Sequence, residues 1–101
     1  MSTSPAAAPA AVFDLDAAWR LSPQVAVRPE RFGALLYHFG TRRLSFVKHP
    51  RLLAVVTALA DAPSARAACA DAGVAAAELP TFQRALAALA ASATVCERAA
   101  A

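Results

Sequence analysis

A few side chains of this sequence could do chemistry, and their spacing decides whether they can act together. They are His38, His49, Cys69, Cys96, Asp14 and Asp16. A catalytic nucleophile needs a base beside it, yet no serine or cysteine has an evident activating partner. We expect His38 to be a strand-surface residue, His49 a turn residue and the aspartates solvated or capping groups. The sequence therefore predicts no enzymatic activity.

Metal and nucleotide sites need patterns that the sequence lacks. Neither cysteine has a CxxC or HxxxH neighbour, so a zinc ion would need ligands from another chain. The three glycines are isolated and form no phosphate-binding loop. We expect no metal and no cofactor, and both cysteines as reduced, buried thiols.

Size and composition point to one small domain. The chain has 101 residues, 58% of them apolar and 17% charged, with a formal net charge of +3. This composition is too apolar for overall disorder. We predict disordered tails over 1–11 and 98–101 and a domain over 12–97. No apolar run reaches the roughly 18 to 20 residues that span a bilayer, and the start lacks a secretory signal. We expect a cytoplasmic protein with no membrane partner.

Alternating and aromatic residues in the first half predict strands. Valines alternate over 24–28, large apolar residues fill 32–39, and apolar residues share one face of 42–47. A short connection containing Gly40 joins the last two segments, which favours an antiparallel hairpin. We therefore predict a three-stranded antiparallel sheet. An irregular or short helical lead-in, anchored by Trp19, is expected before it.

The apolar spacing becomes helical after Pro50. A first helix is expected as far as Asp61, a second is expected to be capped by Ser64 and ended by Gly73, and an apolar stripe over 79–93 predicts a third. Strands followed by helices in separate blocks define an α+β fold. The predicted architecture is a three-stranded antiparallel sheet followed by a three-helix, winged helix-turn-helix-like bundle.

Polar, mostly basic side chains gather around the third predicted strand, at Arg42, Arg43, Lys48, His49 and Arg51. They could guard a strand edge against aggregation or form a recognition surface. An open strand edge beside an amphipathic helix suits an extended peptide, and the cations favour an acidic one. DNA binding by the third helix, or another small protein-interaction role, stays an alternative. Because Arg84 is the only cation of that helix, we expect no nucleic-acid partner.

Several stretches carry a family resemblance: WRLSPQVAVRPE over 19–30, FGALLYHFGTRRL over 32–44 and LLAVV over 52–56. Together they resemble the mycofactocin biosynthesis chaperones, roughly over 19–95. The resemblance implies a non-catalytic precursor-peptide recognition element, similar to pyrroloquinoline quinone biosynthesis protein D, to which the leader of a ribosomally made peptide adds as an extra strand. It also implies a partner, a radical S-adenosylmethionine maturase, which modifies the terminal Val-Tyr of the precursor while this chain presents the leader.

The resemblance implies that the leader lies along the third predicted strand and against the third helix. The implied peptide-binding residues are Arg42, Arg43, Leu44, Ser45, Phe46, Val47, Phe82, Arg84, Ala85 and Leu89. Phe82 and Leu89 also belong to one helical stripe, and for these two the spacing favours a place in the core.

Overall fold

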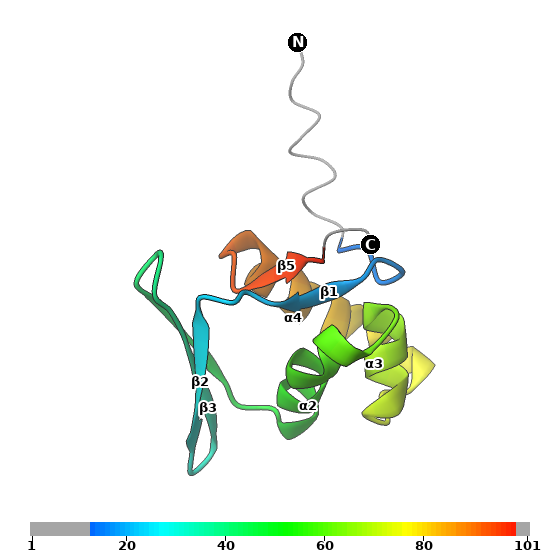
Figure 1. The fold of residues 1–101 in the computed structure, drawn as a ribbon. Coiled ribbons are helices and arrows are strands. Elements are labelled where there is room, and N and C mark those ends of the chain that lie inside the picture. The colour runs from blue at the N-terminus through cyan, green and yellow to red at the C-terminus, as the bar shows by residue number, and fades with distance from the viewer. Residues whose placement is uncertain (1–12, 99–101) are drawn as a thin grey trace.

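The computed structural model describes residues 13–98, which fold as strands set against a group of short helices (Figure 1). The strands are β1 (Trp19–Leu21), β2 (Val25–Glu30), β3 (Gly33–His38), β4 (Arg43–Val47) and β5 (Val95–Glu97). The helices are α2 (Pro50–Ala58), α3 (Ala65–Asp71) and α4 (Leu79–Ala91), with 3₁₀ turns η2 (Leu59–Asp61) and η3 (Ala76–Glu78). The α+β class predicted from the sequence is confirmed.

The predicted three-stranded antiparallel sheet is present, in the order β2-β3-β4. Figure 1 shows it at one side of the molecule, with the helices at the other. Its inner face carries Ala34 and Leu36 of β3 and Val47 of β4, all buried in the core. Because side chains alternate along a strand, Leu35 and Tyr37 point to the opposite face. The sheet thus has one covered face and one that the helices leave open.

A second sheet corrects the prediction for the segment before β2. Residues 13–21 were expected to be irregular or helical, but β1 pairs antiparallel with β5, with Trp19 opposite Glu97 and Leu21 opposite Val95. The two strands are three residues long and come from nearly opposite ends of the described chain. Such a short, non-local pair leaves no alternation in the sequence for a local pattern to detect.

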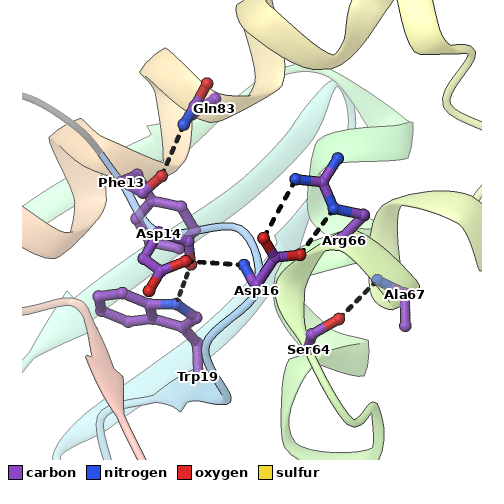
Figure 2. A network of polar contacts seen from close by, with 8 residues as sticks. All are labelled: Phe13, Asp14, Asp16, Trp19, Ser64, Arg66, Ala67 and Gln83. Carbon is purple, nitrogen blue, oxygen red and sulfur yellow. Dashed lines mark hydrogen bonds and ion pairs between the residues drawn. The ribbon is translucent and has the colours of Figure 1, made fainter.

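The lead-in itself is held by side chains rather than by regular structure (Figure 2). The Trp19 ring stacks on Phe13 with 4.2 Å between centroids, and its indole N–H donates to the Asp14 carbonyl at 2.8 Å. The Gln83 amide of α4 donates to the Phe13 carbonyl at 2.6 Å. Trp19 is therefore an anchor, as expected, and it fixes the segment between β1 and α4.

Local capping explains where the helices begin. The His49 ring nitrogen Nδ1 accepts from the Arg51 N–H at 3.2 Å, and Pro50 occupies the first turn. The Ser64 hydroxyl accepts from the Ala67 N–H at 3.1 Å, and Gly73 follows α3 with a φ of +84°. Both predicted caps of α3 are confirmed. The tails predicted over 1–11 and 98–101 lie outside the described residues, apart from Arg98.

One hydrophobic core joins the two sheets and the helices. Its largest fully buried side chains include Leu36 of β3, Val55 of α2, Leu86 of α4 and Val95 of β5. Cys69 of α3 is fully buried among them, whereas Cys96 is half-buried, so the expectation of buried thiols holds for the first cysteine only. None of the helices in this part of the chain combines the length and the apolar character needed to cross a membrane.

Candidate peptide-binding site

The strand β4 has a neighbouring strand on one side only within residues 13–98. The Phe39 N–H donates to the Gln24 carbonyl at 2.8 Å, on the β2 side of β3. In an antiparallel sheet the main-chain N–H and C=O groups of successive residues point to opposite sides of the strand. Because those of Phe39 point to β2, those of Leu36 and His38 point to β4. Their register partners are Ser45 and Arg43. On β4 the main-chain groups of Arg43 and Ser45 therefore point to β3, and those of Leu44 and Phe46 point to the open edge.

A small apolar hollow begins where β4 ends. It has a volume of about 190 Å³ and is lined by His49, Leu52, Thr81, Phe82 and Ala85. His49 follows the last residue of β4 by two positions, so the hollow lies close to that end of the strand. Its other walls come from the first turn of α2 and the first two turns of α4. An extended chain on the β4 edge thus has an apolar recess at one end of its path.

The walls of the hollow are fixed by an ion pair between helices. The Arg51 guanidinium donates to both carboxylate oxygens of Glu78, at 2.6 and 2.5 Å, and lies 5.5 Å from the Phe82 ring centroid. The His49 ring meets the same ring edge-on, with 5.4 Å between centroids. The hydrogen bond from Arg51, with that from the Ala75 N–H, lowers the pKa of Glu78 from 4.5 to about 2.

The structure separates the implied strand residues by role. Leu44 and Phe46 are exposed on the open face, whereas Ser45 is half-buried and Val47 belongs to the core. Arg42 and Arg43 are exposed at the β3–β4 hairpin, where Arg42 takes a φ of +61°. That hairpin lies at the opposite end of β4 from the hollow, about 13 Å along the strand.

The implied helix residues also divide into two groups. Phe82 and Ala85 line the hollow, although Phe82 is largely buried. Leu89 is buried and part of the core, as its spacing indicated. Arg84 is exposed on α4, one turn from Thr81, and does not line the hollow. Sequence reasoning did not assign Leu52 or Thr81 to the site, and neither residue carries a charge or motif that could have marked it.

The polar cluster around β4 is smaller than the sequence indicated. Arg51 is engaged by Glu78 and so does not project toward the strand. His49, expected in a turn, is the cap of α2. The exposed cations that remain beside β4 are Arg42, Arg43 and Lys48. The separation in sequence between Arg51 and its partner explains why the pattern alone could not remove it from the cluster.

The candidate chemistry-bearing residues have structural partners. His38, expected on the strand surface, is buried, and its Nδ1 accepts from the N–H groups of Gly40 and Thr41 at 3.0 and 3.1 Å. Asp16 pairs with Arg66 at 2.8 Å (Figure 2). Burial raises the pKa of the Cys69 thiol, which disfavours the nucleophilic thiolate. Among residues 13–98, no three His, Cys, Asp or Glu side chains gather as metal ligands do.

An open strand edge with an apolar hollow close to one end, on a small α+β scaffold, is the arrangement of a binding domain. The chain belongs to the Peptide chaperone MftB family, which it matches over residues 18–96. This result confirms the resemblance to the mycofactocin biosynthesis chaperones, and it makes the chain a peptide chaperone by family.

Curated relatives carry the same family name. The chain is 60% identical over 87 residues to Peptide chaperone MftB of Mycobacterium ulcerans, covering 86% of this chain and 80% of the relative. It is 60% identical over 80 residues to Peptide chaperone MftB of Mycobacterium tuberculosis, covering 79% and 73%. With that of Mycolicibacterium smegmatis it shares 65% identity over 63 residues, 62% of each chain. No solved structure matches the chain at comparable significance.

Proposed function

We propose that this chain binds the leader of the mycofactocin precursor peptide by strand addition to β4 and presents it to a radical S-adenosylmethionine maturase, without catalysing a reaction itself. The observation that carries the proposal is the open edge at Leu44 and Phe46, with the hollow bounded by Phe82 and Ala85 close to one end of the strand. Main-chain hydrogen bonds supply affinity in this mode, and side-chain recesses supply specificity.

The charge around the site supports an acidic leader. Arg42, Arg43 and Lys48 are exposed at the two ends of β4, and Arg84 is exposed on α4, one turn from Thr81 of the hollow. Exposed cations of this kind raise the association rate of an anionic ligand more than they strengthen the final complex. The family membership supports a peptide ligand, and the cations describe the kind of peptide that the site suits.

The alternative, DNA binding through α4, has less support. A recognition helix presents several polar side chains to the major groove. In α4 the Gln83 amide is used by the Phe13 carbonyl, Arg84 is the only cation and much of the remaining exposed surface is alanine. The geometry of α4 therefore favours the apolar hollow over a groove-reading surface.

A titration tests the proposal. A fluorescently labelled synthetic leader, and separately a labelled DNA duplex, is titrated with the chain, and the maturase reaction on full-length precursor is followed with and without the chain. We expect saturable leader binding, weak and strongly salt-dependent DNA binding, and modification that depends on the chain. Modification at the same rate without the chain would disprove the presenting role, and a tight sequence-specific duplex complex would favour the alternative.

A further inference from the structure

The open face of the three-stranded sheet carries apolar side chains that point out of the sheet plane, whereas an added leader strand pairs with main-chain groups in that plane. We call this open face the outer face, and it comprises Arg28 of β2, Leu35 and Tyr37 of β3, Phe39 of the hairpin and Leu44 and Phe46 of β4. The exposed fractions of Phe39, Leu44 and Phe46 are 59%, 63% and 48%. Leu35 lies opposite Phe46, and Tyr37 opposite Leu44, so the apolar groups adjoin across strands.

The net positive charge of the molecule comes from the segment that contains this face. Residues 24–49 hold five of the ten cations and one of the seven anions of the chain. The single anion, Glu30, is paired with Arg28 at 3.3 Å. Residues 13–23 and 50–98 together hold five cations and six anions, so the rest of the described chain is nearly balanced. The outer face thus belongs to the segment that carries the net positive charge, although Arg43, opposite the buried His38, lies on the other face of the sheet.

The sequence and the charge decide between possible occupants. Residues 1–12 and 99–101 contain no acidic residue and no aromatic one, so these segments offer little to a basic, aromatic face. A second copy related by a two-fold axis would bring two positively charged segments together, which is unfavourable. Four of the five cations are arginine, and arginine and aromatic residues are enriched at protein interfaces, where lysine is depleted. An acidic protein surface with an apolar centre fits best.

We infer that the outer face docks such an acidic, partly apolar surface of a protein partner, which on the proposed function is the maturase. Strand addition extends the sheet sideways in its own plane, whereas a docked protein approaches perpendicular to it. Leader and partner therefore occupy the chain at the same time. The added strand also widens the surface that the partner contacts.

Two substitutions probe the outer face outside β4. Arg28 lies on β2, two strands from that edge, or roughly 10 Å from β4, and charges at this distance are screened at physiological salt. Phe39 packs edge-on against Tyr37, with 5.2 Å between ring centroids, and its side chain is mostly exposed. Both Arg28→Glu and the double variant Arg28→Glu/Phe39→Ser should therefore fold. Arg20→Glu on β1 is the matched control, because it makes the same charge change outside the three-stranded sheet.

Binding of each variant to the labelled leader and to purified maturase is measured at two salt concentrations, with circular dichroism to confirm folding. We expect the double variant to keep its leader affinity within about twofold and to lose maturase affinity by at least tenfold, with a smaller loss for Arg28→Glu alone. The Arg20→Glu control should change neither. Maturase affinity within twofold of the parent for a folded double variant would overturn the inference while leaving the proposed function intact.

Further measurements on the parent chain separate the remaining outcomes. Failure of the parent to bind the leader would contradict the proposed function. Failure of the parent to bind the maturase would contradict both the presenting role and the docking inference. Co-sedimentation with vesicles that contain phosphatidylserine tests whether the outer face binds a membrane. Sedimentation equilibrium of the chain alone tests whether it binds a second copy. Vesicle binding or dimerisation that Arg28→Glu/Phe39→Ser abolishes would overturn the inference in favour of a membrane surface or a second copy.

Discussion

Arg51 at the start of α2 and Glu78 just before α4 form a two-pronged ion pair, with nitrogen–oxygen distances of 2.6 and 2.5 Å. The pair joins the two helices that enclose the apolar hollow, and the Arg51 guanidinium also lies over the Phe82 ring, which lines the hollow. The shape of the candidate site thus depends on a contact between segments that are distant in the sequence.

The ion pair makes folding sensitive to acid. The pKa of Glu78 is lowered from 4.5 to about 2, because the charged carboxylate accepts hydrogen bonds from Arg51 and the Ala75 N–H. A lowered pKa in the folded state means that the stabilisation is complete above pH 4.5 and is lost as the pH falls from 4.5 toward 2. We expect Glu78→Gln to lower the midpoint of urea unfolding modestly at pH 7, as partly exposed pairs do.

The same experiment repeated in acid checks the assignment. The difference in urea midpoint between parent and Glu78→Gln should shrink as the pH is lowered through this window, because the parent then also loses its charged carboxylate. If the difference in urea midpoint stays constant from pH 7 to about pH 2.5, Glu78→Gln changes stability through packing and not through the loss of the carboxylate charge.

His38 is predicted to hold the hairpin that presents β4. Its Nδ1 accepts from the Gly40 and Thr41 N–H groups, so His38→Phe leaves both donors without their partner. Because Gly40 and Thr41 are exposed and water can take the place of the ring nitrogen, we expect a loss of about 0.5–1.5 kcal/mol in the free energy of unfolding. Amide hydrogen exchange measured by NMR should show faster exchange at Gly40 and Thr41 than in the parent. Unchanged exchange at these two amides would show that the ring is only a core residue.

The sequence predicted most of the sheet and the helices, because their signals are local. Pro50, Ser64 and Gly73 affect only the helix end at which they lie, and each marks a helix boundary that the structure confirms. The sequence could not predict on which face of the sheet His38 lies, because large apolar residues occupy both faces of 32–39. Long-range pairing was equally hidden: the β1–β5 pair and the partner of Arg51 depend on contacts that only the folded chain creates. The hollow was missed for the same reason.

Filling the hollow should block peptide binding without unfolding the protein. Ala85 is half-buried and lines the hollow, whereas Ala88, one turn later on α4, is exposed and does not line it. A phenyl ring fits within the roughly 190 Å³ available. We expect Ala85→Phe to weaken leader binding at least about tenfold, or 1.4 kcal/mol, and Ala88→Phe to change it less than twofold. Equal leader affinity for the two folded variants would exclude the hollow from the site.

The hairpin cations should act mainly on the rate of association. Arg42 and Arg43 are exposed, and charges in this position steer an anionic ligand through solvent. Reversing both to glutamate should lower the association rate of an acidic leader about tenfold at low salt and make the remaining binding less salt-sensitive. Stopped-flow mixing at several salt concentrations measures both effects. A change confined to the dissociation rate would instead assign these side chains to direct contacts with the bound peptide.

Strand addition makes the most specific prediction, because alternate residues of β4 face opposite sides. The Phe46 N–H faces the open edge, so Phe46→Pro leaves the hairpin intact and removes one donor from the leader. We expect a folded variant with at least about tenfold weaker leader binding, since one ladder bond is lost and the ring obstructs approach. Phe46→Ala is the matched control for the side chain.

Ser45→Pro tests the other direction of the ladder. The Ser45 N–H faces Leu36 inside the sheet, so proline leaves that carbonyl without its donor and should cost about 1–3 kcal/mol in the free energy of unfolding. In urea unfolding, with Ser45→Ala as control, Ser45→Pro should therefore lose more stability than Phe46→Pro. In leader titration of folded protein, Phe46→Pro should show the larger loss of affinity. If Phe46→Pro folds and binds the leader as tightly as Phe46→Ala, the leader does not add to this edge, and binding must lie on the helices.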